Sequence, residues 1–156
     1  MKDIDLGKLN KIFFTQHKVV LAYAFGSFVR GKFGSLSDLD IAVLFSKDID
    51  PKDYFRKEFF LSLEIEKITG VEADIINLAK PISPLLKHNA IFNGRLIFAR
   101  DKKIRFSEEF SVRKEFEDTI FLRKNQSNLM VKRIKDGTFG KAGIASQYLK
   151  KYVSAS

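Results

Sequence analysis

Residues 24–45 read AFGSFVRGKFGSLSDLDIAVLF, and this stretch constrains the fold of the chain more than any other. An apolar run at residues 19–25 leads into it, nearly continuous and rich in β-branched and aromatic side chains, as expected of a strand buried on both faces. The stretch ends in a second predicted strand at residues 38–45. A Gly-Ser turn and a glycine-rich loop connect the two strands, so the sequence predicts a loop that closely approaches a ligand.

Three aspartates fall on the predicted strands. Asp38 and Asp40 share one face of the second strand, and Asp74 lies on a third predicted strand at residues 71–78. Converging carboxylates repel one another, by about 1 kcal/mol per pair at 4 Å in water and several-fold more in a partly buried cleft. A chain without cysteine that offers only oxygen ligands favours Mg2+ or Mn2+ over zinc. Two such ions could bind an attacking oxygen and a leaving pyrophosphate together.

The turn at Gly26 and Ser27 predicts a cradle for a triphosphate. Gly26 lets the backbone come close, while Ser27 and the N–H groups of a following helical turn are placed to donate to phosphate oxygens. Arg30 is positioned to pair with a phosphate, the alternative being an ion pair with one of the aspartates. Phe28 and Phe33 flank the turn and are interpreted as core side chains, with contact to a nucleotide base as the alternative.

The remaining pattern predicts mainly helices. Apolar spacing indicates helices at residues 5–17, 51–70, 81–92 and 107–135, the last either one long helix or a broken one, with a short strand at 95–99. We predict one domain at residues 1–135, with a catalytic core at about 15–100 and a C-terminal helical segment at about 105–135. A short basic tail, either a helix or a loose end, follows at residues 136–156.

The amino-acid composition and the charge of the chain limit where it acts and which partners it could attract. The longest apolar runs are far shorter than the roughly 20 residues that cross a bilayer, and the N-terminus lacks the features of a signal peptide, so we expect a cytoplasmic protein. The net charge is +9, and residues 101–156 carry 13 Lys and Arg against 7 Asp and Glu. Such a segment could attract a nucleotide, a nucleic acid or an acidic protein, or could be a solvated basic face without a dedicated partner.

Through Gly26-Ser27, Arg30-Gly31 and Ser37-Asp38-Leu39-Asp40, the chain resembles the superfamily of polymerase beta and the aminoglycoside nucleotidyltransferases over about residues 15–100. Within it, the chain is most similar to the minimal nucleotidyltransferases, including the MntA-type antitoxins that accompany HEPN toxins. The resemblance implies a polymerase beta-like α/β (α+β) fold, with a small mixed sheet flanked by helices and a long C-terminal helical segment.

The same resemblance implies roles for the aspartates. Asp38 and Asp40 would bind both metal ions, and Asp74 would bind the catalytic ion and help to deprotonate the acceptor hydroxyl. The expected reaction transfers AMP from ATP, with Mg2+, to a hydroxyl of a partner protein. The partner implied by the resemblance is a HEPN ribonuclease toxin, modified on a tyrosine and held in a hetero-oligomer, which makes this chain an antitoxin.

Three alternatives stay open at this point. The chain could neutralise its partner by contact alone, with a degenerate or regulatory nucleotide site. It could transfer a nucleotide to a small molecule such as an aminoglycoside. Its basic region at residues 102–133 could also bind nucleic acid, although that region lacks a recognisable groove-reading motif, and such binding would be dominated by phosphates and steeply dependent on salt.

Overall fold

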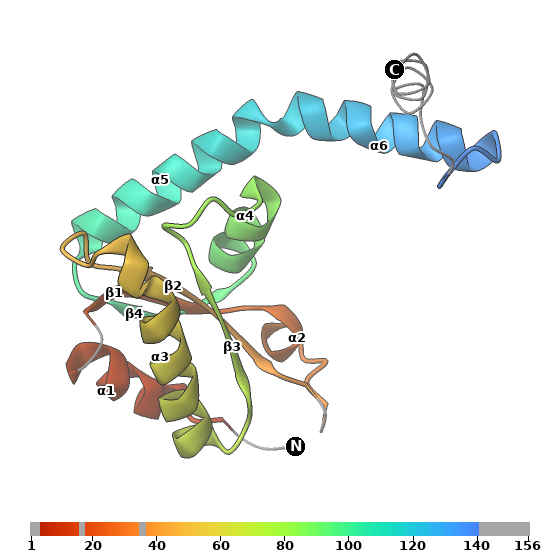
Figure 1. Cartoon of the computed structure of the whole chain (residues 1–156). Coiled ribbons are helices and arrows are strands. Elements are labelled where there is room, and N and C mark those ends of the chain that lie inside the picture. Colours follow the sequence, from red (N-terminus) through yellow and green to blue (C-terminus); the bar gives the residue numbers. More distant parts are fainter. Residues whose placement is uncertain (1–3, 16–17, 35–36, 141–156) are drawn as a thin grey trace, which may run out of the picture. The chain divides into compact units, whose positions relative to one another are not determined.

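A computed structural model describes residues 4–15, 18–34 and 37–140 of the chain (Figure 1). The predicted helix or loose end at residues 141–156 lies outside this part. The chain divides into two compact units, Met1–Glu117 and Asp118–Ser156, and each is described by itself. The elements of the first unit are α1 (Leu6–Thr15), β1 (Val19–Ala24), α2 (Gly26–Val29), β2 (Leu39–Phe45), η1 (Pro51–Asp53), α3 (Tyr54–Thr69), β3 (Ala73–Asn77), α4 (Pro84–Phe92), β4 (Arg95–Ala99) and most of α5 (Lys102–Asp118).

The strands of the first unit form a single mixed sheet in the order β3-β2-β1-β4. β1 pairs antiparallel with β2 and with β4, whereas β2 pairs parallel with β3. The parallel pair is made possible by α3, which carries the chain back along the sheet between the two strands. This architecture confirms the predicted small mixed sheet flanked by helices.

Helices cover both faces of the sheet, and each face has its own apolar core. Figure 1 shows α1 and α3 on one side and α4 and α5 on the other. The first core, on the α1 and α3 side, includes Phe13, Leu39, Ile41, Leu61 and Ile65. The second core, on the α4 and α5 side, includes Tyr23, Ala42, Ala90, Ile91 and Val112. Because β1 contributes to both cores, all six of its residues are buried, as its sequence predicted.

Prolines and glycines set the helix limits. Pro51 opens η1, and Gly70, in the left-handed conformation with φ 66°, ends α3, so the helix predicted at residues 51–70 is confirmed. The next helix begins at Pro84, three residues later than expected from residues 81–92. The reason is local: Pro84 forces Ser83 into an extended conformation with ψ 130°, and a helix cannot run through it.

The C-terminal helical segment is broken, one of the two forms predicted. α5 ends at Asp118, and α6 (Ile120–Lys135) follows after Thr119, which has the non-helical angles φ −97° and ψ 0°. α5 also begins earlier than residue 107, because the Asp101 carboxylate accepts a 2.6 Å hydrogen bond from the Lys103 N–H at the start of the helix. No helix in the described residues is long and apolar enough to span a membrane.

Candidate nucleotidyl-transfer site

Asp40 and Asp74 lie side by side on the parallel strands β2 and β3. They are direct register partners, and both strands begin at this end of the sheet. The residues two positions further on, Ala42 and Ile76, belong to the second core, so both aspartates project on the face covered by α4 and α5. Strand phase assigned Asp40 and Asp74 each to one face of its own strand, and the structure brings these two faces to the same side of the sheet.

Asp38 precedes β2 and is exposed. The strand is fixed immediately after it, where the Leu39 N–H donates a 2.8 Å hydrogen bond to the Glu72 carbonyl just before β3. The negative charge of Asp38 acts on Asp40 and contributes to raising its pKa. Asp38 is therefore electrostatically part of the same group, although it lies outside the ladder that aligns Asp40 with Asp74.

Gly26 packs its backbone directly against the Asp40 carboxylate. Its φ is +72°, a conformation that side chains with a Cβ rarely adopt, and an added Cβ would lie 1.8 Å from Asp40 Oδ2. The neighbouring Phe25 N–H donates a 3.0 Å hydrogen bond to the Asp40 carbonyl. Glycine is thus required here for two independent reasons, and the turn and the carboxylate form one structural unit.

The electrostatics of Asp40 reflect the same close packing. Burial raises the pKa of its carboxyl above the ordinary value of 3.8, and the charges of Asp74 and Asp38 raise it further. Opposing this, a hydrogen bond from the Ser27 backbone N–H and the charge of Arg30 lower the pKa. On balance the pKa of Asp40 is raised, because burial and the neighbouring carboxylates outweigh Ser27 and Arg30. Negative charge is therefore crowded at this end of the sheet.

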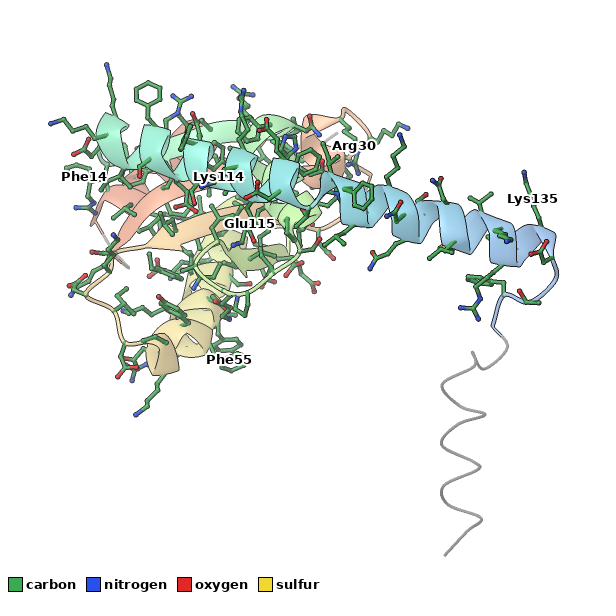
Figure 2. All side chains as sticks on the ribbon, turned by 90° about the horizontal axis from the view of Figure 1, so that it is seen from above. Phe14, Arg30, Phe55, Lys114, Glu115 and Lys135 are labelled. Carbon is green, nitrogen blue, oxygen red and sulfur yellow. The ribbon has the colours of Figure 1, made fainter. Side chains whose placement is uncertain are left out.

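Ser27 lies in the short helical turn α2, and Arg30 follows directly after it as the C-terminal cap, in agreement with the turn predicted after Gly26. The turn is closed by the Arg30 N–H, which donates to the Gly26 carbonyl at 3.3 Å, and the Lys32 N–H donates to the Ser27 carbonyl at 3.0 Å. The Arg30 side chain is exposed (Figure 2) and forms no ion pair within the described part of the chain. Of the two roles considered for Arg30, an ion pair with Asp38 or Asp40 is absent from this structure.

Phe28 and Phe33 pack inward. Their rings meet edge to face with centroids 5.4 Å apart, and both side chains are packed against the first core. This arrangement agrees with their interpretation as core residues, because the pair holds α2 and the loop after it against the sheet.

Gly94 is a structural support that the sequence did not single out. An added Cβ would lie 2.0 Å from the Ala90 carbonyl oxygen and 2.8 Å from the Ala24 carbonyl oxygen. The turn between α4 and β4 therefore packs on the end of β1, two residues before Gly26. Its contact with Ala24 depends on tertiary packing that no local pattern encodes.

The donor set suits a hard divalent cation, yet it is incomplete as a preformed site. Asp40 and Asp74 offer carboxylate oxygen alone, and a cation would relieve the charge crowding that raises the pKa of Asp40. Among the described residues, no three His, Cys, Asp or Glu side chains are grouped so that they could hold a metal ion. The structure thus supplies an aligned aspartate pair, with Asp38 coupled to it by charge.

The fold, the Gly-Ser turn and the aligned aspartates define a nucleotidyltransferase domain. Residues 7–103 match the family model described as "Polymerase beta, Nucleotidyltransferase". The chain belongs to this family and is a nucleotidyltransferase by class. No curated protein sequence matches the chain significantly.

Several solved structures share the fold. A toxin–antitoxin crystal structure with AMP-PNP contains a chain 19% identical, with a TM-score of 0.68, and the match covers 82% of this chain and 99% of that one. A toxin–antitoxin MntA complex with two aspartates replaced by glutamate gives 16% identity, a TM-score of 0.67 and coverage of 82% and 99%. The complex of the tri-AMPylated Shewanella oneidensis HEPN toxin with the MNT antitoxin contains a chain 16% identical, with a TM-score of 0.61. That match covers 81% of this chain and 95% of the other.

Proposed function

We propose that this protein transfers AMP from ATP to a hydroxyl group of a partner protein and releases pyrophosphate. The observation that carries the proposal is the alignment of Asp40 with Asp74 beside the turn at Gly26. Oxygen ligands at one point and a backbone turn suited to phosphate are the two parts that nucleotidyl transfer needs. We place the reaction in the cytoplasm, with which a chain without cysteine is compatible.

Each residue has a distinct task in this proposal. Asp40 and Asp74, together with Asp38, would hold Mg2+, which supplies positive charge to the phosphates and to the attacking oxygen. Gly26 keeps the Asp40 carboxylate in place. The Ser27 hydroxyl and the exposed Arg30 guanidinium would bind the triphosphate and orient its α-phosphate. Asp74, the more exposed of the aligned pair, would accept the proton of the acceptor hydroxyl.

The proposed acceptor is a HEPN toxin, modified on a tyrosine. Support comes from the solved complexes that share this fold, one of which contains AMP-PNP and another a tri-AMPylated HEPN toxin. Modification of a toxin by its antitoxin would make this chain a neutralising enzyme. An aminoglycoside or another small molecule is the alternative acceptor, and it requires no protein docking surface.

Labelled ATP tests the reaction directly. The purified chain is incubated with a candidate HEPN-domain toxin encoded by the same genome, and label on that protein is followed by gel and mass spectrometry. We expect Mg2+-dependent addition of AMP to a tyrosine, lost in Asp40→Asn. Label on an aminoglycoside instead of the protein would contradict the proposed acceptor, and absence of label on either would contradict the transfer.

Neutralisation by contact is the second candidate, favoured by one observation. Among the described residues, no three carboxylates are grouped so that they could hold a metal ion. A protein that neutralises its partner by binding alone does not need such a group. The Asp40→Asn variant separates the candidates: full neutralisation of toxin activity by this variant, without label, would support contact alone.

A further inference from the structure

The two sides of α5 differ sharply, and its inner side is firmly held. Val112 is buried in the second core, and the Tyr23 hydroxyl donates a 2.9 Å hydrogen bond to Glu109 Oε1. Closer to the C-terminal end, Glu115 Oε2 lies 3.2 Å from Lys87 Nζ of α4, and Phe116 stacks on His88 with ring centroids 3.9 Å apart. These contacts fix α5 along most of its length, so its outer side is presented on a rigid support.

The outer side carries one apolar stripe with a lysine at each end. Lys103, Phe106, Phe110 and Lys114 are spaced i, i+3, i+7 and i+11, which places them on one line along the helix. Phe106 is 62% exposed and Phe110 is 72% exposed. Both lysines are exposed and form no ion pair with another described residue. We call these four residues the α5 stripe; Figure 2 labels Lys114 beside the inward-bonded Glu115.

We propose that the α5 stripe is the docking surface for the acceptor protein, and that it takes an amphipathic helix with an apolar centre and acidic ends. This proposal rests on the proposed function, because only a protein acceptor needs such a surface. Two phenylalanines on one helical line supply anchors of the kind that helix-in-groove recognition uses. The two lysines select a partner helix that is acidic at both ends, and they fix its position along the stripe.

Charge spacing favours a protein over a polynucleotide. Eleven residues of helix place Lys103 and Lys114 about 16 Å apart, with two phenylalanines on the line between them. The Arg105 guanidinium lies over the Phe106 ring, 5.8 Å from its centroid, but Arg105 is paired with Glu109 at 2.7 Å. A nucleic-acid strand carries a negative charge about every 3.4 Å and is bound by correspondingly dense cations. The α5 stripe instead matches a surface whose charges are confined to its two ends.

Two further observations connect the stripe to the reaction. α5 covers the second core, on the same face of the sheet from which Asp40 and Asp74 project. In addition, the similarity to a chain of the toxin–antitoxin structure with AMP-PNP covers 82% of this chain, about 128 residues, whereas the family domain ends at residue 103. The shared fold therefore extends into the C-terminal helices, which a nucleotide site alone does not require.

The first experiment removes the aromatic anchors. Phe106→Ser with Phe110→Ser is compared with a matched control on α3, Phe55→Ser with Phe59→Ser, since these residues are also exposed, 76% and 52%. The acceptor probe is the candidate HEPN-domain toxin used in the labelling experiment. We expect the α5 double variant to raise KM for that protein at least about 10-fold, or about 1.4 kcal/mol, with kcat at saturation and KM for ATP unchanged. An unchanged KM, or a larger effect from the control pair, would overturn the proposal.

The second experiment reverses the end charges and does not depend on catalysis. Binding of the same HEPN-domain protein is measured by calorimetry without nucleotide, for Lys103→Glu with Lys114→Glu and for the control Lys8→Glu with Lys67→Glu. We expect Kd to rise at least about 10-fold only in the first pair. Equal effects in both pairs would show a general charge effect and refute the docking assignment.

The outcomes of the two experiments distinguish failure of the stripe from failure of the reaction. Transfer of AMP with a KM insensitive to the stripe leaves the reaction standing and removes the docking surface. Binding that depends on the α5 stripe, without transfer of label, supports the docking surface and contradicts the proposed reaction. Binding of a 20-nucleotide single-stranded RNA that the lysine reversals abolish, with HEPN binding unchanged, would assign the stripe to nucleic acid and overturn the proposal. Absence of any binding by the unmodified protein overturns it as well.

Discussion

Strand β1 and helix α6 represent opposite ways of using apolar residues. Every one of the six residues of β1 is buried, and they serve both cores of the first unit. α6 has sixteen residues and buries none of them, although it contains Ile120, Phe121, Leu122, Leu129, Met130, Val131 and Ile134. It also contains five basic residues and no acidic one.

This difference in burial distinguishes the first unit, which positions the candidate site, from α6, whose apolar side chains are exposed. In the first unit, apolar burial is complete enough to hold Asp40 and Asp74 in register. In α6, seven large apolar side chains are exposed, and the five charged residues are all basic. Function in the first unit should therefore be sensitive to changes of an ångström, whereas function in the C-terminal helices should depend on surface chemistry and tolerate such changes.

The largest expected effect is on catalysis. Asp40→Asn should lower AMP transfer at least about 1,000-fold, since the charge that compensates a divalent cation is lost while the shape of the side chain is kept. Lys124→Gln, a charge removal on α6, should change kcat less than about 2-fold. Single-turnover assays with labelled ATP measure both variants. Comparable losses of activity in the two variants would contradict the functional difference between the first unit and α6.

Gly26 provides the next largest effect. Gly26→Ala should lower transfer at least about 100-fold and the free energy of unfolding by about 2–3 kcal/mol, because the new Cβ would collide with the Asp40 carboxylate. The matched control is Gly31→Ala: φ is also positive, at +68°, but no atom lies within 4 Å of the added Cβ. Backbone strain alone, about 1 kcal/mol, is expected there, with activity retained. Denaturant titration and transfer assays test the pair.

The two sides of α5 bring the comparison within one helix. Val112→Ala should cost about 2 kcal/mol of unfolding free energy, since it leaves a cavity in the second core. Phe110→Ala should stay within about 0.5 kcal/mol, because that ring is 72% exposed. Urea unfolding followed by circular dichroism measures both. A large loss of stability in Phe110→Ala would mean that the outer side of α5 is structural.

The smallest effect concerns the pH dependence of stability. Because the folded protein raises the pKa of Asp40, ionisation of this carboxyl works against folding, and the cost appears as pH rises through the raised pKa. Asp40→Asn should therefore be more stable than the unmodified protein at pH 7, by less than about 1 kcal/mol after solvent screening. The difference should vanish near pH 3. Thermal melts at both values test the sign, and a destabilised variant at pH 7 would contradict it.

Local patterns predicted the parts of the fold that local chemistry controls. The strand at residues 95–99 and the end of the helix near residue 70 were placed correctly, because a short apolar run and a left-handed glycine cap act over a few residues. The break at Thr119 was left open by the sequence, since no glycine or proline marks it. The late start of α4 could have been found from Pro84, whose effect on the preceding residue is a sequence rule.

The sequence named the residues of the candidate site, but it did not give their arrangement. Phase along β2 gave the face of Asp40, and phase along β3 gave the face of Asp74. That the two strands are neighbours, parallel, and aligned at these two residues follows from the sheet as a whole. The contact of Gly26 with Asp40 and that of Gly94 with Ala24 likewise arise only when distant segments meet.

With the proposed roles of Asp40 and Asp74, AMP transfer requires the correct parallel register of β2 and β3. Side chains alternate between the faces of a strand, so a slip of β3 by one residue would turn Asp74 toward the first core and bring Ile75 beside Asp40. Such a misfolded molecule could keep its secondary structure and much of its compactness while losing every turnover. The specific activity of a purified sample therefore counts correctly aligned molecules, which spectroscopic measures of helix and strand content cannot do.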